Sequence, residues 1–185
     1  MDDAELETLK AAVQELMDRQ AIADVLRHYA RGLDRKDIPL LQSAYHPDST
    51  DHHGAFGDYT PAPEAIVEDW LIRDADRAFS HHLLLNSSVE LDGDDAYGET
   101  YFQVIAGLTP EAAERTGKPA LTIGAGRYID HFQRRDGEWR IARRVLISEF
   151  SAALNATENP QALLWARRSK EDPSYDRPLL GPPAP

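Results

Sequence analysis

The stretch from Gly124 to Phe150, GAGRYIDHFQRRDGEWRIARRVLISEF, most constrains what this chain can fold into. Two runs of alternating polar and apolar residues are separated there by Asp136-Gly137. An Asp-Gly pair between such runs is a strong signal for a tight β-hairpin. The sequence therefore predicts two long antiparallel strands joined by a short turn.

Apolar residues fall on both faces of the second strand of this hairpin. Strict alternation places Trp139, Ile141, Val145 and Ile147 on one face, and Ala142, Arg144, Leu146 and Phe150 on the other. Such a strand belongs to a sheet that is covered on both sides, by its own helices and by something else, for example another subunit. A buried Arg144 would require an anionic partner or a ligand, so a structural ion pair and a functional role are both open.

The charge balance excludes several classes of function. The 185 residues, one domain by length, carry 20 Lys and Arg against 32 Asp and Glu, a formal net charge of -12. Such a chain repels phosphate backbones and anionic lipids, so we expect neither nucleic-acid nor membrane binding. Cysteine is absent, which excludes disulfides and thiol chemistry. The N-terminus does not resemble a signal peptide, and we expect a cytoplasmic protein.

The first half of the chain is predicted to be mainly helical. Apolar residues recur at helical spacing, and Asp18 and Pro63 can each begin a helix. The predicted helices cover residues 3–17, 18–33, 37–44 and 63–76.

Alternation with a period of two predicts strands at residues 49–53, 80–91 and 96–107. Between residues 108 and 119, Thr109 and Pro110 can begin one or two helical turns, as a cover over a pocket or as a plain surface loop. Helices followed by mostly antiparallel strands indicate an α+β domain, with a curved sheet wrapped around the N-terminal helices and an internal cavity.

We expect this domain to cover residues 1–155. Residues 156–185 are predicted to form a C-terminal helix, from Asn159-Pro160 to Arg168, and a proline-rich arm. The arm could lie extended on another surface or be disordered.

Tyr29 and Asp34 could act in the cavity, although each has a structural explanation. A tyrosine in an apolar helix stripe is usually part of the core, and an aspartate after Gly32 fits a turn. Five residues at ~100° each put the two side chains about 140° apart, so they converge only if the helix ends near Gly32.

Two pairs of neighbouring histidines are further candidates. His81 and His82 point to opposite faces of a strand, and His82 can face inward only if the cavity is lined with polar groups and the apolar face is covered elsewhere. His52 and His53, beside Asp51, leave the same choice open. No recognisable metal-ligand spacing is present among the histidines and acids, and we expect no metal and no cofactor.

Three segments together resemble a known family. They are RQAIADVLRHYARGLDRKD, HLLLNSSVELDGDDAYGETY and GRYIDHFQRRDGEWRIARR. In this order and at these separations they resemble the SnoaL-like branch of the NTF2-like superfamily, over roughly residues 10 to 150. That group includes scytalone dehydratase, bile acid 7α-dehydratase and lindane dehydrochlorinase. The resemblance implies an NTF2-like cone and a homo-oligomer, with a trimer favoured over a dimer.

The resemblance also implies roles for four residues. His82 matches the family's base, and Asp34 matches the acid that holds this histidine. Tyr29 lies where the bile acid enzyme has tyrosine and the dehydrochlorinase has lysine, and Arg144 matches the arginine that assists departure of the leaving group. The candidate substrate-binding residues are His53, Asn86, Tyr101 and Leu146.

The chain departs from the pattern on its third strand. Where some dehydratases have a second histidine or acid, it has Ile105 and Gly107. Proton delivery to a leaving hydroxyl is therefore unassigned, and His52, His53, Tyr101 or a water molecule could supply it.

These residues lead to the hypothesis of a cofactor-independent lyase. It would carry out a dehydratase-type elimination on a small, ring-bearing, largely apolar substrate. Carbon–carbon cleavage of an aromatic diol (deformylase type) and ketosteroid-type isomerisation need the same base and anion stabiliser. A non-catalytic NTF2-like module that binds a hydrophobic ligand or a protein is the alternative from another class, and it would not require Asp34 to contact His82.

Overall fold

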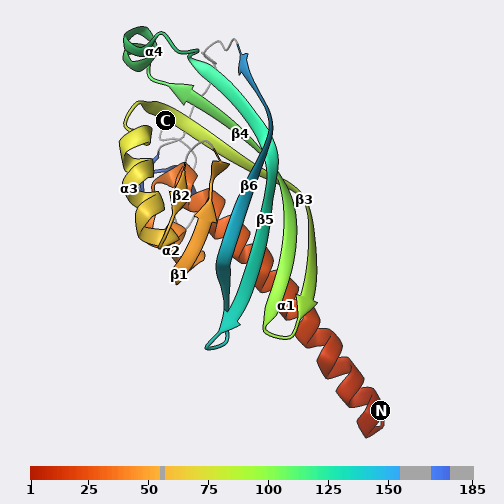
Figure 1. Cartoon of the computed structure of the whole chain (residues 1–185). Coiled ribbons are helices and arrows are strands. Elements are labelled where there is room, and N and C mark those ends of the chain that lie inside the picture. The colour runs from red at the N-terminus through yellow and green to blue at the C-terminus, as the bar shows by residue number, and fades with distance from the viewer. Residues whose placement is uncertain (55–56, 155–167, 176–185) are drawn as a thin grey trace, which may run out of the picture.

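A six-stranded curved sheet wraps around a long N-terminal helix in the computed structural model, which describes residues 1–54, 57–154 and 168–175 (Figure 1). The helices are α1 (Asp3–Arg35), α2 (Ile38–Ser43), α3 (Ala62–Asp74) and α4 (Pro110–Thr116). The strands are β1 (Tyr45–His52), β2 (Asp58–Tyr59), β3 (Arg77–Asp92), β4 (Asp95–Leu108), β5 (Leu121–Arg135) and β6 (Glu138–Leu154).

The sheet has the order β2-β1-β6-β5-β4-β3 and is antiparallel except for the parallel pair of β1 and β6. The predicted α+β architecture, a curved and mostly antiparallel sheet around the N-terminal helix, is confirmed. The predicted hairpin is formed by β5 and β6. Its turn residues Asp136 and Gly137 both have positive φ, 54° and 81°, as a tight two-residue hairpin turn requires.

The first two predicted helices are in fact one helix, so the predicted break at Asp18 is wrong. A capping box between Asp2 and Glu5 begins α1, and Lys36 in the left-handed conformation ends it. The carboxylate of Asp18 is buried and accepts hydrogen bonds from Trp139 Nε1 (2.9 Å) and Arg134 Nη1 (2.8 Å). It therefore ties the middle of α1 to the β5–β6 hairpin.

The predicted division of β6 into two faces is also wrong, because a β-bulge interrupts the strand. Phe132 of β5 pairs with Ile141 and His131 pairs with Arg143, which leaves Ala142 as an extra residue on β6. An extra residue reverses the alternation beyond it. Trp139 and Ile141 consequently share the buried inner face with Arg144 and Leu146.

The apolar face of α1 packs into the concave side of the sheet. The fully buried residues of this core include Ile22, Tyr29, Phe132 and Ile141. The convex side carries apolar residues that a single chain leaves exposed: Leu83, Leu85, Tyr97, Tyr101 and Ile147. Leu9, Val13 and Leu16 are also exposed, on the part of α1 that projects beyond the sheet (Figure 1). Within the described residues, no helix is long and apolar enough to cross a membrane.

The excursion between β4 and β5 forms the predicted helix, α4, with Thr109 as its N-cap. The predicted helix from Asn159-Pro160 lies outside the described residues except for Arg168. Residues 168–175 lie against the end of α1 and the segment that follows it, where Lys170 and Tyr175 bind Asp37 and Arg35 pairs with Asp172. This part of the C-terminal segment contacts its own domain.

The close approach of α2 to α1 at Gly32 gives a test of the packing beside the site. A Cβ on Gly32 would lie 2.6 Å from the backbone nitrogen of Leu41, so Gly32→Ala must push the two helices apart. We expect it to lower the free energy of unfolding by ~1–3 kcal/mol, measured by urea denaturation. Gly124→Ala is the control because nothing lies within 4 Å of its Cβ position. Equal stability of the two variants would contradict this packing.

Candidate active site

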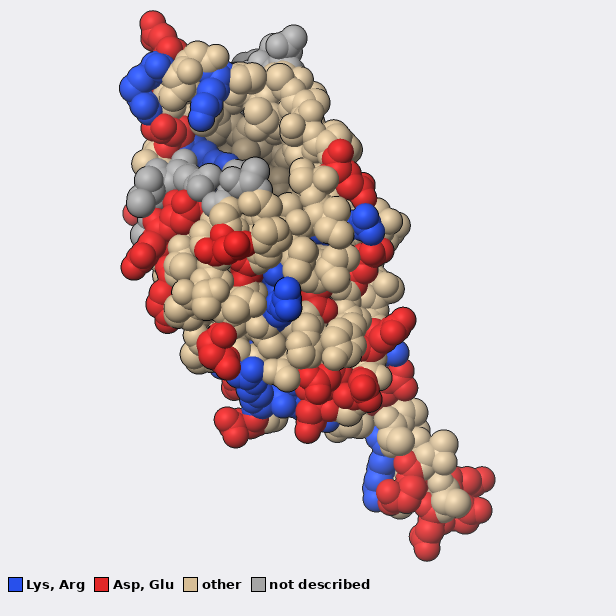
Figure 2. All heavy atoms as spheres, viewed as in Figure 1, with Lys and Arg blue, Asp and Glu red and all other residues tan. Residues whose placement is uncertain are grey.

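A cavity of about 390 Å³ lies between α1, α3 and the concave face of the sheet. Its walls are mostly apolar, with Leu33, Ile66, Phe102, Val104, Ile123 and Leu146 among them. Figure 2 shows the surface hollowed on this side of the molecule. Polar groups reach the cavity from two histidines, His82 and His53, and from the tyrosines Tyr29, Tyr59 and Tyr128. An apolar pocket with a few convergent polar groups is typical of a small-molecule site.

His82 faces the cavity from β3, and Asp34 in the last turn of α1 holds it. The Nδ1 atom of His82 lies 2.6 Å from Asp34 Oδ1, and its backbone N–H donates to Asp34 Oδ2 at 2.9 Å. The Ser80 hydroxyl donates to the same carboxylate at 3.0 Å. Only 9% of the His82 side chain is exposed.

Asp34 is a carboxylate at neutral pH. Burial by itself would raise its pKa, but the hydrogen bonds from His82 and Ser80 outweigh burial and lower the pKa below the usual aspartate value. A carboxylate beside Nδ1 fixes the proton of the neutral imidazole on that atom. The Nε2 atom then carries the lone pair.

Tyr29 and Asp34 both reach His82, although α1 does not end at Gly32. The helix continues to Arg35, so the expectation that convergence requires an early helix end is wrong. The Tyr29 ring is in edge contact with the His82 ring, with centroids 6.2 Å apart, while Asp34 bonds Nδ1. The two side chains diverge from the helix and meet the imidazole at different points.

Arg144 does not line the cavity. It is fully buried, and its Nε and Nη2 atoms donate to the two carboxylate oxygens of Asp130 at 2.7 and 2.8 Å. Its guanidinium lies 4.2 Å from the ring centroid of Tyr29 and 4.1 Å from that of Tyr128. The structural ion pair left open by the sequence is therefore present.

Two buried phenols separate this ion pair from the cavity. Burial raises the pKa of Tyr29 well above its usual value and raises the pKa of Tyr128 to about 12. Both hydroxyls are therefore protonated at neutral pH and can donate hydrogen bonds. Tyr128 was not among the sequence candidates, although its position on β5 in line with Asp130 and Phe132 marked it as inward-facing.

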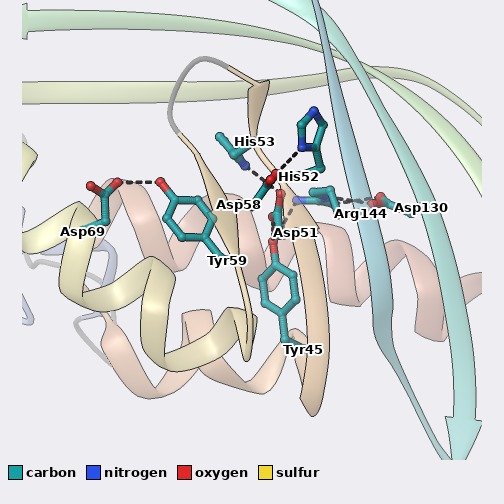
Figure 3. Close-up of polar contacts among 9 residues, drawn as sticks. All are labelled: Tyr45, Asp51, His52, His53, Asp58, Tyr59, Asp69, Asp130 and Arg144. Atoms are coloured by element: carbon teal, nitrogen blue, oxygen red, sulfur yellow. Dashed lines mark hydrogen bonds and ion pairs between the residues drawn. The ribbon is translucent and has the colours of Figure 1, made fainter.

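His53 belongs to a second histidine–aspartate pair, at the end of β1 (Figure 3). Its Nδ1 atom lies 3.0 Å from Oδ1 of the fully buried Asp51, whose Oδ2 accepts from the Tyr45 hydroxyl at 2.7 Å. Burial by itself would raise the pKa of Asp51, but the hydrogen bonds from His53 and Tyr45 and the nearby Arg144 charge together outweigh burial and lower the pKa. The neighbouring His52 is exposed and pairs with Asp58 instead.

The remaining candidates are divided between the two faces of the sheet. Leu146, a predicted substrate-binding residue, lines the cavity. Asn86 is exposed beside a β3 bulge and is not among the lining residues. Tyr101 is 40% exposed on the convex face, where the Arg127 guanidinium lies 5.8 Å from its ring centroid. Among the described residues, no group of three or more His, Cys, Asp or Glu side chains could hold a metal ion.

Comparison with known families and structures supports this fold. The sequence model of a family described as SnoaL-like domain matches residues 14–145. Among curated proteins, no sequence matches the chain.

Solved structures share the fold at low sequence identity. A type 2 hexachlorocyclohexane dehydrochlorinase (LinA) is 19% identical, with a TM-score of 0.71 over 82% of this chain and 99% of its own. The type 3 LinA of Novosphingobium barchaimii is 19% identical, with a TM-score of 0.70 over 82% of this chain and 99% of its own. A protein from Novosphingobium aromaticivorans described as "Putative Scytalone Dehydratase" is 17% identical, with a TM-score of 0.67 over 83% of this chain and 99% of its own.

The ion pair beneath the two phenols can be tested by unfolding. Arg144→Met leaves the Asp130 carboxylate buried without a cation, and we expect a loss of ~3–5 kcal/mol in the free energy of unfolding. The double variant Arg144→Met with Asp130→Asn removes both charges and should recover most of this loss. Arg115→Met, which breaks an exposed pair with Asp76, is the control. An Arg144→Met protein as stable as the wild type would refute a structural role for this pair.

Proposed function

The chain belongs to the SnoaL-like domain family, and on this premise we propose that it is a cofactor-independent lyase of the dehydratase type. Its substrate is small, ring-bearing and largely apolar. The observation that carries the proposal is the 2.6 Å contact between His82 Nδ1 and the Asp34 carboxylate at the wall of an apolar cavity. The dehydrochlorinase and dehydratase names of structures with this fold support an elimination reaction.

In the proposed reaction His82 is the general base. Asp34 holds the proton on Nδ1, so the Nε2 lone pair takes an acidic proton from a substrate carbon. Asp34 also stabilises the imidazolium that forms, as in other carboxylate–histidine pairs. General-base catalysis of this kind contributes about 10²–10⁴-fold to the rate.

Tyr29 stabilises the negative charge that develops on the substrate. It is a protonated phenol at the cavity wall beside His82, so it can donate a hydrogen bond to an enolate oxygen in a site with little water. Arg144 acts behind it as a positioning residue, because its guanidinium lies against the Tyr29 and Tyr128 rings rather than in the cavity. Its positive charge favours electron density on both phenol oxygens.

The size of the cavity limits the substrate. A volume of about 390 Å³ is near the lower end of the range of ~300–1,000 Å³ for ligand pockets. This favours one or two rings over a steroid, and thus elimination over ketosteroid-type isomerisation. A ligand-binding module without catalysis would not need the partly buried Asp34 carboxylate against His82, so this contact favours an enzyme.

Substitution of the pair tests the proposed base. We expect His82→Ala and Asp34→Asn to lower elimination from a panel of cyclic β-hydroxy ketones by about 10²–10⁴-fold, because the base or its orientation is lost. Enone formation is followed by ultraviolet absorbance. The melting temperatures should stay close to that of the wild type.

His81→Ala is the matched control, since His81 neighbours the base on the same strand but is exposed. It should retain wild-type turnover. Loss of folding in both His82→Ala and Asp34→Asn would instead indicate a structural role for the pair.

We also propose that the chain forms a homo-oligomer, with a trimer favoured. The convex face of the sheet exposes Leu83, Leu85 and Tyr97 by 39, 53 and 54%, and a second copy of the chain is the proposed cover. We therefore expect light scattering at micromolar concentration to give about three times the chain mass of 20.7 kDa.

Leu85→Glu places a charge on this face and should shift the mass toward that of one chain. Lys118→Glu, an exposed change outside the patch, should leave it unchanged. A wild-type mass of 20.7 kDa would refute the assembly proposal.

A further inference from the structure

Elimination of water requires a proton donor for the departing oxygen, because hydroxide is a poor leaving group. The proposed base removes a proton and does not supply this one. Arg144 does not line the cavity, and its hydrogen bonds go to Asp130 and to the Tyr45 hydroxyl. Ile105 and Gly107 have no ionisable side chain. The donor must therefore come from another part of the cavity wall.

We propose that His53, held by Asp51, donates the proton to the leaving oxygen. This inference rests on the proposed elimination and assigns the step which that proposal leaves open. His53 lines the same cavity as His82, and 17% of its side chain is exposed. Its Nδ1 atom lies 3.0 Å from a buried carboxylate, so a ring that faces the cavity has a fixed orientation.

The surroundings of Asp51 hold the pair in place. Tyr45 donates its hydroxyl proton to Asp51 and lies 3.5 Å from Arg144 Nη1, which links the pair to the buried ion pair (Figure 3). The Asp51 side chain is fully buried, whereas Asp58, the partner of His52, is 75% exposed. A fixed ring and a buried carboxylate distinguish His53 from its neighbour.

The two ends of the cavity differ in charge. Near His53 lie the carboxylates of Asp51 and Asp130 and the guanidinium of Arg144, and Asp69 bonds the Tyr59 hydroxyl beside the His53 ring. Among these groups, carboxylates outnumber cations around His53.

At the other end, Asp34 is the carboxylate that holds His82. The Arg168 guanidinium lies 3.4 Å from the Ser80 hydroxyl, which bonds Asp34, and it also donates to the Leu33 and Asp34 carbonyls. Arg77 lines the cavity from β3.

The two imidazoles flank one pair of phenols. The His82 ring contacts Tyr29, the His53 ring lies 6.4 Å from Tyr128, and the Tyr29 and Tyr128 rings are in edge contact at 5.6 Å. In the sheet, β3, which carries His82, is separated from β1, which ends next to His53, by β4, β5 and β6. A substrate lying over the two phenols can therefore present a C–H bond to His82 and a leaving oxygen to His53.

The step balances without a further reactant. His82 takes the proton from the carbon next to a carbonyl, and the C–H electron pair becomes the new C=C bond. The neighbouring C–O bond breaks with its electron pair on oxygen, and His53 gives that oxygen a proton to form water. His82 ends protonated and His53 deprotonated, and exchange with solvent restores both.

Two probe substrates that differ only in the leaving group test this assignment. They are 3-hydroxy-5-phenylcyclohexanone and its 3-acetoxy ester, and both yield 5-phenylcyclohex-2-enone. Acetate departs without a proton, so only the alcohol needs the donor. We expect His53→Gln to lower elimination of water by about 10²–10⁴-fold and to change elimination of acetate by no more than a few-fold. His82→Gln should lower both reactions.

His52→Gln is the matched control and should change neither reaction, because His52 lies outside the cavity. Asp51→Asn should reproduce the selective loss in a milder form. Equal losses for both substrates in His53→Gln, or no loss for either, overturn the assignment and leave the base at His82 intact. A wild-type protein inactive on both substrates overturns the proposed elimination itself, and this inference with it.

Discussion

The buried guanidinium of Arg144 is the interaction on which the rest of the site depends. Removing this charge from water is costly, and two hydrogen bonds to Asp130 and two aromatic rings offset the cost. Because Asp130, Arg144 and Tyr29 belong to β5, β6 and α1, one cation fixes the helix against the concave face of the sheet. Tyr45 extends the same network to Asp51, and thus to the end of β1. This single buried charge therefore positions both histidine–aspartate pairs indirectly, through Tyr29 for His82 and through Tyr45 for Asp51.

The general architecture could be predicted from the sequence because it follows from local patterns. The Asp-Gly turn, the alternation and the order of helices and strands each depend on residues close together in the chain. The continuity of α1 could not be predicted in this way, because Arg134 and Trp139, which bind Asp18 from the hairpin, lie 116 and 121 residues away. The bulge in β6 could not be predicted either, because no local sequence signal marks Ala142 as the extra residue that reverses the two faces. Tertiary contacts decided both.

Alternation could not choose between His81 and His82, because the more apolar face of β3 is here the exposed one. Leu83 and Leu85 point outward with His81, and His82 points inward beside the phenols. This reversal follows from the curvature of the sheet, which leaves an internal cavity where polar groups are satisfied by one another. The resemblance to a known family selected His82, but it also pointed to Arg144 as a group that acts on the substrate, and the structure places that side chain behind the cavity wall. Asn86 and Tyr101 are both exposed, and the sequence alone could not predict this. The prediction would have required the position of the β3 bulge beside Asn86 and the identity of the convex face, on which Tyr101 lies.

The presence of two carboxylate–imidazole pairs in one cavity bears on the choice among the possible reactions. A binding module needs neither pair, because an apolar ligand is held by the walls. An isomerase moves one proton between two carbons of the same substrate, and a single base can both remove and return it. An elimination removes a proton at one atom and supplies one to a group leaving the next atom, so two separate groups on either side of the substrate serve it best. His82 on β3 and His53 after β1, with Tyr29 and Tyr128 between them, have this arrangement. The symmetry of the two pairs therefore favours loss of water over the other reactions that a single base could perform.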